Sequence, residues 1–135
     1  MIQRLQSLYL AAAAALLVLF VALADRWGAG LPATAAWLGP LAFGLAVVTA
    51  IAALVGLALF KDRKKQRLVV LAAQWLDLAL VVAVLAGLYL SAEAGIETAS
   101  YIVSLVPVVA YVLLRMARQQ ITKDIELVRS MDRLR

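Results

Sequence analysis

Residues 68–92 of this chain read LVVLAAQWLDLALVVAVLAGLYLSA, and they contain a single charged residue, Asp77. An α-helix rises about 1.5 Å per residue, so about twenty helical residues cross the roughly 30 Å hydrocarbon core of a bilayer. An apolar stretch of this length with one charge is typical of a transmembrane helix. The segment is therefore predicted to cross a membrane once.

Three further stretches share this character, because residues 5–24, 27–60 and 98–114 contain no Asp, Glu, Lys or Arg. The chain has 135 residues, of which 66% are hydrophobic, and its mean hydropathy is +0.98. Soluble domains are only about 45–50% apolar. The predicted fold class is all-α, an integral membrane four-helix bundle with a cytoplasmic C-terminal amphipathic helix over 115–135. We predict a single membrane domain, residues 1–135, with spans at about 5–24, 40–60, 68–90 and 98–114.

Positive charges fall almost entirely on one side of these predicted spans. Of the 13 lysines and arginines, only Arg26 lies between the first and second spans, and none lies between the third and fourth. Short basic loops stay in the cytoplasm, so both termini and the loop after the second span are predicted to be cytoplasmic. The first interpretation of this loop is that it only fixes topology, and the alternative is that it recruits anionic headgroups. Nucleic acid is not expected as a partner. The basic residues of this loop are Lys61, Arg63, Lys64, Lys65 and Arg67.

The N-terminal segment has an alternative interpretation. Arg4, the apolar stretch after it and the sequence Ala22-Leu23-Ala24 resemble a secretory signal with a small-residue cleavage site. The uncharged stretch is nevertheless long enough to span a bilayer, which favours a retained helix. We expect the first span to remain part of the protein.

Small side chains are expected to hold the predicted helices together. Lipid is as apolar as leucine, so there is no hydrophobic drive between helices, and small residues that permit close approach replace it. The sequence therefore predicts close helix packing. Small residues recur at four-residue spacing as Ala42, Ala46 and Ala50, as Ala79, Ala83 and Gly87, and as the pair Ala11 and Ala15.

Aromatic side chains lie near the predicted ends of the spans. Trp and Tyr favour the headgroup level, because their rings are apolar and carry one polar edge. The predicted outer boundary is marked by Trp27, Trp37, Tyr89 and Tyr101.

Asp77 lies near the middle of the third span, where a carboxylate is costly and should face the bundle interior. Gln74 lies on the same helical face, and Thr49 and Ser104 reach a similar depth when the spans alternate in direction. Pro107, one turn after Ser104, is predicted to kink the fourth span. We expect the four polar residues to form an intramembrane layer around this kink. The first interpretation is structural; in the second, Asp77 carries a proton or binds a cation.

The C-terminal tail, residues 115–135, has an amphipathic pattern. Its apolar residues recur at three- and four-residue spacing, so they share one helical face. Three destinations fit that face: the inner leaflet, the bundle itself or a coiled coil, and a groove on another protein. These apolar residues are Ile121, Ile125, Val128, Met131 and Leu134.

The sequence contains no convincing catalytic or cofactor-binding pattern. It has no cysteine and no histidine, which removes thiolate and imidazole ligands. Glu93 and Glu97 lie four residues apart, a spacing typical of a solvated edge, and the segment GAGLP indicates a turn rather than a phosphate-binding loop. We therefore expect no enzyme activity, no metal site and no cofactor.

Both ends of the chain carry a family resemblance. The opening MIQRLQSLYL and the closing KDIELVRSMDRLR are similar to the ends of a family of small bacterial four-span membrane proteins, domain of unknown function 4293. The resemblance covers the whole chain and is carried chiefly by the closing LVRS-x-DRLR. It implies a multi-pass protein of the bacterial inner (cytoplasmic) membrane with a retained N-terminus, and it implies no activity.

The residues that match this pattern place the expected functional surface in the cytoplasm. Both ends of a four-span bundle emerge on the same face, so we predict that Arg4 pairs with Asp124 or Asp132. The cytoplasmic end motifs are Gln3, Arg4, Lys123, Asp124, Arg129, Ser130, Asp132 and Arg133, and the pattern also includes Ile2, Gln6, Leu127, Val128, Leu134 and Arg135.

Two functions are compatible with these features. The first is a non-enzymatic structural or accessory subunit in the lipid bilayer, whose cytoplasmic tail binds a membrane or cytoplasmic protein or a second copy of the chain. The alternative is a small proton or cation transporter, or a channel component, that uses Asp77. Four short helices cannot enclose much of a pore, so this alternative requires an oligomer.

Overall fold

The computed structural model describes residues 2–135, with side chains from Arg4 onward. It is built from long helices joined by short turns, and the predicted all-α four-helix bundle is confirmed. Each long helix is long and apolar enough to cross a membrane. The elements are α1 (Ile2–Ala29), η1 (Ala33–Ala35), α2 (Leu38–Ala58), α3 (Arg63–Ser91), η2 (Ala92–Ala94) and α4 (Thr98–Arg133).

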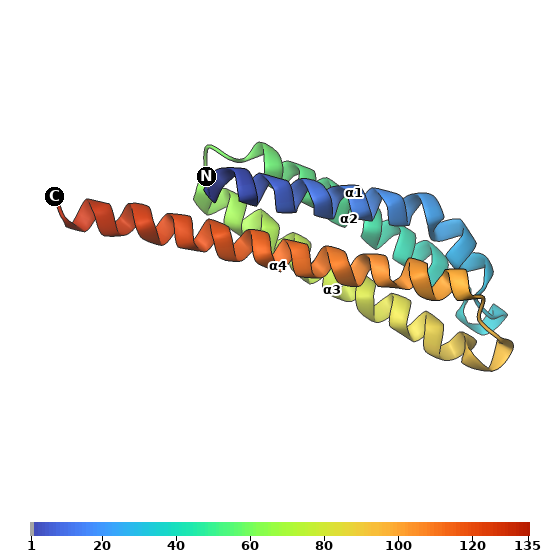
Figure 1. Ribbon diagram of the computed structural model, residues 1–135. Coiled ribbons are helices and arrows are strands. Elements are labelled where there is room, and N and C mark those ends of the chain that lie inside the picture. Colours follow the sequence, from blue (N-terminus) through green and yellow to red (C-terminus); the bar gives the residue numbers. More distant parts are fainter. Residues whose placement is uncertain (1) are drawn as a thin grey trace.

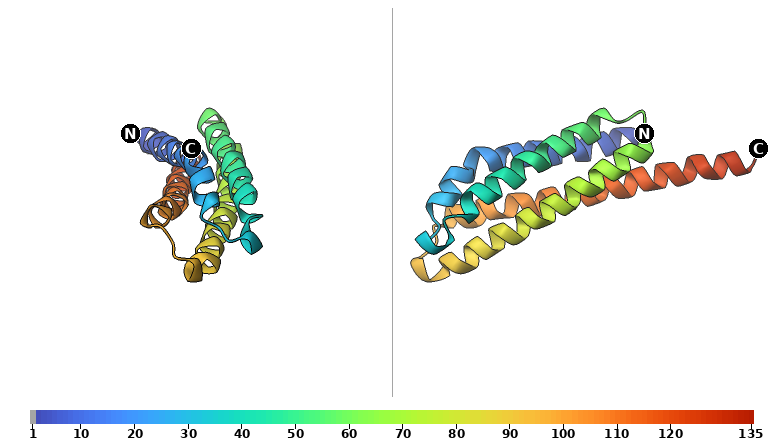
Figure 2. Two further views of the ribbon diagram at one scale, coloured as in Figure 1. Left: turned by 90° about the vertical axis from the view of Figure 1, so that its right-hand side faces the viewer. Right: turned by 180° about the vertical axis from the view of Figure 1, so that it is seen from behind.

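The four helices alternate in direction and pack around a common axis (Figure 1). α1 packs against α2 and α4, and α3 packs against the same two neighbours. The N-terminus and the turn between α2 and α3 lie at one end, whereas η1 and η2 lie at the other. Beyond the first of these ends, α4 continues as a single unsupported helix, as the view from behind shows (Figure 2).

Local sequence signals set the ends of the helices. Gly30 and Pro32 follow the end of α1, and Pro40 lies in the first turn of α2, where a missing N–H breaks no helical hydrogen bond. Gly95 takes a positive φ of 79°, which suits a residue without a side chain. α3 begins at Arg63, because the Asp62 side chain accepts a hydrogen bond from the Lys65 N–H. Most of the basic loop predicted from the sequence is therefore helical.

The core of the bundle is built largely from alanine. Ala42, Ala46 and Ala50 are buried, and Ala83 and Gly87 continue the small-residue surface on α3. The side chains of Ala11 and Ala15 are exposed, so the four-residue spacing in α1 does not mark a packing face. Large apolar side chains such as Val48, Leu85 and Ile102 cover the outside instead. This distribution suits a bundle surrounded by lipid.

Among the aromatic residues at the predicted outer boundary, Trp27 packs inside the bundle. Its side chain is only 2% exposed, whereas Trp37 and Tyr89 are 63% and 81% exposed. The Trp27 ring packs beside Phe20, with a centroid separation of 6.3 Å, and lies over Gly87 of α3. A β-carbon at position 87 would lie 2.6 Å from Trp27 Cζ2. The absent side chain of Gly87 therefore makes room for the indole.

We predict that Gly87→Ala destabilises the bundle by about 1–3 kcal/mol, because the added methyl group overlaps the buried indole. Denaturant titration of purified protein in detergent measures the loss. Gly44→Ala is the matched control, since no atom lies within 4 Å of a β-carbon at this position. Gly44→Ala should leave stability unchanged or raise it by up to about 1 kcal/mol. Equal stabilities of the two variants would contradict the role of Gly87.

Candidate functional site

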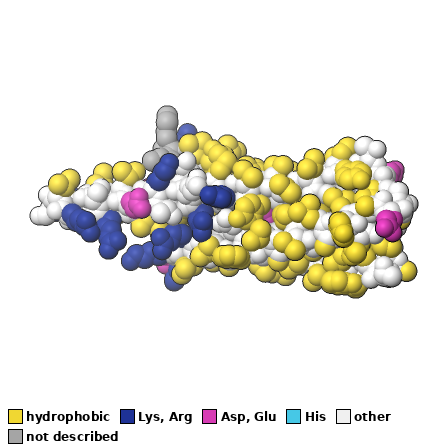
Figure 3. Space-filling model, turned by 90° about the horizontal axis from the view of Figure 1, so that it is seen from below, with side chains coloured by type: hydrophobic (Ala, Val, Ile, Leu, Met, Phe, Trp, Pro, Cys, Tyr) yellow, Lys and Arg dark blue, Asp and Glu magenta, His cyan; other side chains and the backbone are white. Residues whose placement is uncertain are grey.

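Charged side chains gather at the two ends of an otherwise apolar surface (Figure 3). The lysines and arginines lie at the end from which α4 projects, on the face drawn, and acidic side chains appear at the far end. Asp25, Glu93 and Glu97 belong to that far end by their positions next to η1 and η2. The basic end therefore presents the largest concentration of charged groups that the bundle offers to a ligand or partner.

Asp62 organises the start of the basic segment. Its Oδ1 accepts the Lys65 N–H at 3.2 Å, and its Oδ2 lies 3.4 Å from Lys65 Nζ. The backbone hydrogen bond, with the adjacent ammonium group, lowers the pKa of the Asp62 carboxyl below its usual range. Lys61 lies over the Phe60 ring, 5.9 Å from its centroid. Two cations at the turn between α2 and α3, Lys61 and Lys65, thus each lie next to a neighbouring side chain.

Gln66 is an inward-facing polar residue that the sequence analysis missed. Its Nε2 donates a 2.9 Å hydrogen bond to the carbonyl of Gly56, which joins α3 to the end of α2. It lies eight residues before Gln74 and four before the buried Val70. This helical spacing is the signal that would have found it.

Arg63 pairs with Asp124 and links the start of α3 to α4. The Nε–Oδ2 distance is 3.1 Å, and the side chains are 29% and 13% exposed. Asp124 Oδ2 has no partner by hydrogen-bond geometry, so this contact is an ion pair rather than an aligned hydrogen bond. Arg4 is exposed and forms neither predicted pair among the residues with described side chains. The reason is that α3, rather than the end of α1, supplies the cation that reaches Asp124.

The tail is the continuation of α4, and its apolar face divides into two parts. Ile121 is buried, and Ile125 packs against the core cluster that contains Leu10 and Leu114, so both isoleucines belong to the bundle. The apolar residues beyond Ile125 are exposed, by 49% at Leu127, 45% at Val128, 67% at Met131 and 89% at Leu134.

We call Leu127, Val128, Met131 and Leu134 the tail stripe. Lys123, Arg129, Ser130, Asp132 and Arg133 are exposed around it, and the Gln3 side chain lies outside the described residues.

The predicted polar layer lies inside the bundle. Thr49, Gln74, Asp77 and Ser104 are all buried. The two hydroxyls donate to carbonyls of their own helices, Thr49 to Leu45 at 2.7 Å and Ser104 to Ser100 at 2.6 Å. No hydrogen bond joins the four residues to one another in the described part of the chain. Its functional role stays a prediction.

Asp77 and Gln74 separate two groups of buried apolar residues along α3. Ala73 belongs to one core cluster and Leu80 to the other. Both Asp77 oxygens and Gln74 Oε1 are buried and lack a hydrogen-bond partner within residues 4–135. α4 continues through Pro107, which is buried, and the predicted kink stays a prediction. An unpartnered carboxyl in the middle of a helical bundle is unusual enough to require a functional hypothesis.

The described residues contain no cluster of potential metal ligands. Within the described residues, no group of three or more Asp, Glu, His or Cys side chains lies close enough to hold a metal ion. The candidate functional features are the cations at one end of the bundle, the apolar stripe on the tail and the buried carboxyl of Asp77.

A family model described as a domain of unknown function (DUF4293) matches residues 2–134. No curated protein and no solved structure matches the chain.

We predict that Asp124→Asn lowers the free energy of unfolding by about 1 kcal/mol, because it removes the carboxylate that faces Arg63. Asp132→Asn is the matched control, since Asp132 is exposed, and it should have no measurable effect. Denaturant titration of Asp124→Asn, Arg63→Gln and the double variant gives the coupling energy. A larger coupling of Asp124 to Arg4 than to Arg63 would contradict the assigned pair.

Proposed function

The chain belongs to the DUF4293 family, and from that premise we propose that it is a non-enzymatic accessory subunit of a bacterial inner-membrane assembly. In this proposal the bundle is the membrane anchor, and the tail stripe binds a protein partner. The cationic end, which includes the basic segment at the start of α3, faces the cytoplasm. The tail would then project from the membrane towards cytoplasmic or peripheral proteins.

The observation that carries this proposal is the exposed apolar stripe on the part of α4 that extends beyond the bundle. Leu127, Met131 and Leu134 are spaced by four and three residues, so they share one face, and Val128 lies beside it. Nothing in the described residues covers this face. An exposed apolar patch with a charged border is typical of a protein interaction site.

The course of α4 favours a protein partner over the inner leaflet. A helix that lies on a leaflet must turn into the membrane plane, whereas α4 keeps its direction past the bundle (Figures 1 and 2). From Ile125 to Arg133 the helix advances about 12 Å beyond its last packed residue. The stripe has too few apolar positions to sustain a coiled coil by itself. A short amphipathic helix seated in an apolar groove of another protein fits this geometry best.

A second function is supported by the burial of Asp77. The carboxyl is fully buried, and neither oxygen has a hydrogen-bond partner among the described residues. Intramembrane carboxyls commonly mark proton or cation pathways. Since one bundle cannot enclose a pore, we propose as the alternative that several copies assemble into a small transporter around Asp77.

We predict that a photo-cross-linking residue at Met131 forms an adduct with one defined protein in native membranes. Arg129 is the control position, because it lies on the same two turns but away from the stripe, and should give at most a weak adduct with that protein. Leu127→Asp, which places a charge within the stripe, should reduce the Met131 adduct at least tenfold. Immunoblotting and mass spectrometry of the adducts measure the outcome.

The accessory role would be contradicted by adducts at Met131 that contain lipid alone. It would also be contradicted by the same adduct at equal yield from Arg129. Circular dichroism and gel filtration check that Leu127→Asp leaves the bundle folded, which is expected because residue 127 lies outside the core.

For the alternative, we predict that vesicles containing the protein dissipate a pH gradient and that Asp77→Asn abolishes this flux. A dye sensitive to internal pH reports the rate. Glu93→Gln is the control, because Glu93 is an exposed acid in η2, and it should retain full flux. Empty vesicles and vesicles with wild-type protein that leak equally would exclude proton transport by Asp77.

A further inference from the structure

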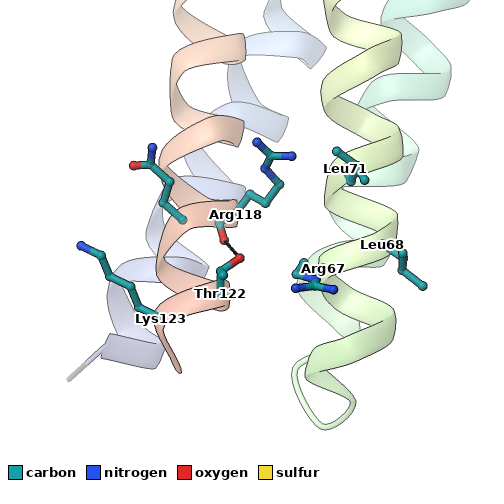
Figure 4. A pocket seen from close by; sticks show the side chains of 7 residues that line it. Arg67, Leu68, Leu71, Arg118, Thr122 and Lys123 are labelled. Atoms are coloured by element: carbon teal, nitrogen blue, oxygen red, sulfur yellow. Dashed lines mark hydrogen bonds between the residues drawn. The ribbon is translucent and has the colours of Figure 1, made fainter. Parts of the chain in front are cut away.

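A cleft between α3 and α4 at the basic end is not used by either proposed function. It has a volume of about 660 Å³ and is lined by residues 67, 68 and 71 of α3 and 118, 119, 122 and 123 of α4. Ligand sites in proteins commonly have volumes of about 300–1,000 Å³. The close-up in Figure 4 shows the Arg67 and Arg118 side chains on the sides of their helices that border this space.

The charge in this cleft is positive and uncompensated by its own lining. Arg67, Arg118 and Lys123 contribute three cations, and no carboxylate is among the lining residues. Asp124 is engaged with Arg63 and Asp62 with Lys65, and Asp132, which lines a neighbouring cleft together with Arg67, forms no ion pair within residues 4–135. Two guanidinium groups from facing helices repel each other unless an anion lies between them. Guanidinium forks match the oxygens of a phosphate group particularly well.

The cleft lies where the apolar belt meets the basic end. Arg67 directly precedes the apolar stretch 68–92. Arg118 lies about one turn after Leu114, the last residue of the apolar stretch 98–114. Both guanidinium groups are therefore placed at the headgroup level of a surrounding bilayer. Leu71 lines the cleft one turn further into the apolar belt, on the same helix as Arg67. A ligand that fills the space meets cations at one end and hydrocarbon at the other.

The cleft lining also contains two neutral polar side chains. The Thr122 hydroxyl already donates to the Arg118 carbonyl at 3.0 Å, so it offers no donor to a phosphate oxygen (Figure 4). Gln119 contributes an amide that can donate hydrogen bonds. Lys123 points away from the gap in Figure 4 and contributes charge at its border rather than a direct contact.

We propose that this cleft binds an anionic phospholipid, with the phosphate ester held between Arg67 and Arg118 and an acyl chain lying along Leu71. The phosphate chemistry alone would also suit a soluble phosphate ester. The position of the cleft at the membrane boundary, and its apolar inner end, select the lipid. This site is separate from the tail stripe, which begins at Leu127, about one turn after Lys123.

The experiment compares lipid binding by purified full-length protein in mild detergent, measured by native mass spectrometry and by thermal unfolding. Phosphatidylglycerol is titrated against phosphatidylcholine with the same acyl chains. We expect phosphatidylglycerol to bind selectively and to raise the unfolding temperature. Arg67→Gln and Arg118→Gln should each weaken phosphatidylglycerol binding about fivefold or more. Arg115→Gln is the control, because it removes the same charge from an exposed site of α4 outside the cleft lining, and should change binding less than twofold.

Three results would overturn the site. The first is unchanged phosphatidylglycerol binding by both cleft variants. The second is an equal loss with Arg115→Gln, which would indicate diffuse attraction to the basic end. The third comes from a parallel titration with glycerol 3-phosphate: protection equal to that of phosphatidylglycerol would assign the cleft to a soluble ester rather than to a lipid. Should Arg118→Gln fail to fold by circular dichroism, Arg67→Gln decides the question, since its side chain is exposed.

Discussion

Close approach of helices through small side chains is the constraint on which this structure depends. Many leucine and valine side chains face outward. Because lipid is as apolar as these side chains, burying them between helices would add little stability. Cohesion must come from contact between the helices themselves. The buried series Ala42, Ala46 and Ala50 and the missing side chain at Gly87 allow that contact. The indole of Trp27 fills the space left by Gly87.

Close helix packing leaves little room between the helices, so buried polar side chains have few possible hydrogen-bond partners. At the basic end, Gln66 satisfies a carbonyl of α2, and Arg63 reaches across to Asp124 on α4. These contacts fasten α3 to both of its neighbours at the end where α4 leaves the bundle. In the middle of the bundle the hydroxyls turn back to their own helices, which leaves Asp77 surrounded by side chains that offer it no donor. The same tight packing therefore rigidifies the end and isolates the carboxyl.

The sequence predicts the parts of this arrangement that depend on composition and period. Length and hydropathy are sufficient to predict four helices that could span a membrane. The cost of a charge in hydrocarbon is sufficient to predict that Asp77 faces the inside of the bundle. Contacts between residues that are far apart in the sequence cannot be predicted from composition and periodicity. The ion pair of Arg63 with Asp124 depends on where α3 begins, which a single capping carboxylate decides. The Trp27 ring faces inward over Gly87, sixty residues later in the chain. A rule that places aromatic residues at the ends of spans does not predict whether such a ring faces the bundle or its surroundings.

The tail shows why an amphipathic pattern alone leaves its destination open. Periodicity joins Ile121 and Leu134 in one stripe, yet only its first part packs in the bundle. Ile125 contacts a core cluster, whereas the apolar residues after it are exposed. What remains exposed is a shorter stripe on a helix that the Arg63–Asp124 pair holds in place. In the proposed accessory role, Arg118 lies at the membrane boundary, and the straight course of α4 sets the distance of the stripe from that boundary. A partner that binds it therefore needs an apolar groove at that height, and this geometric requirement, rather than the strength of the apolar pattern, is what gives such a short surface specificity.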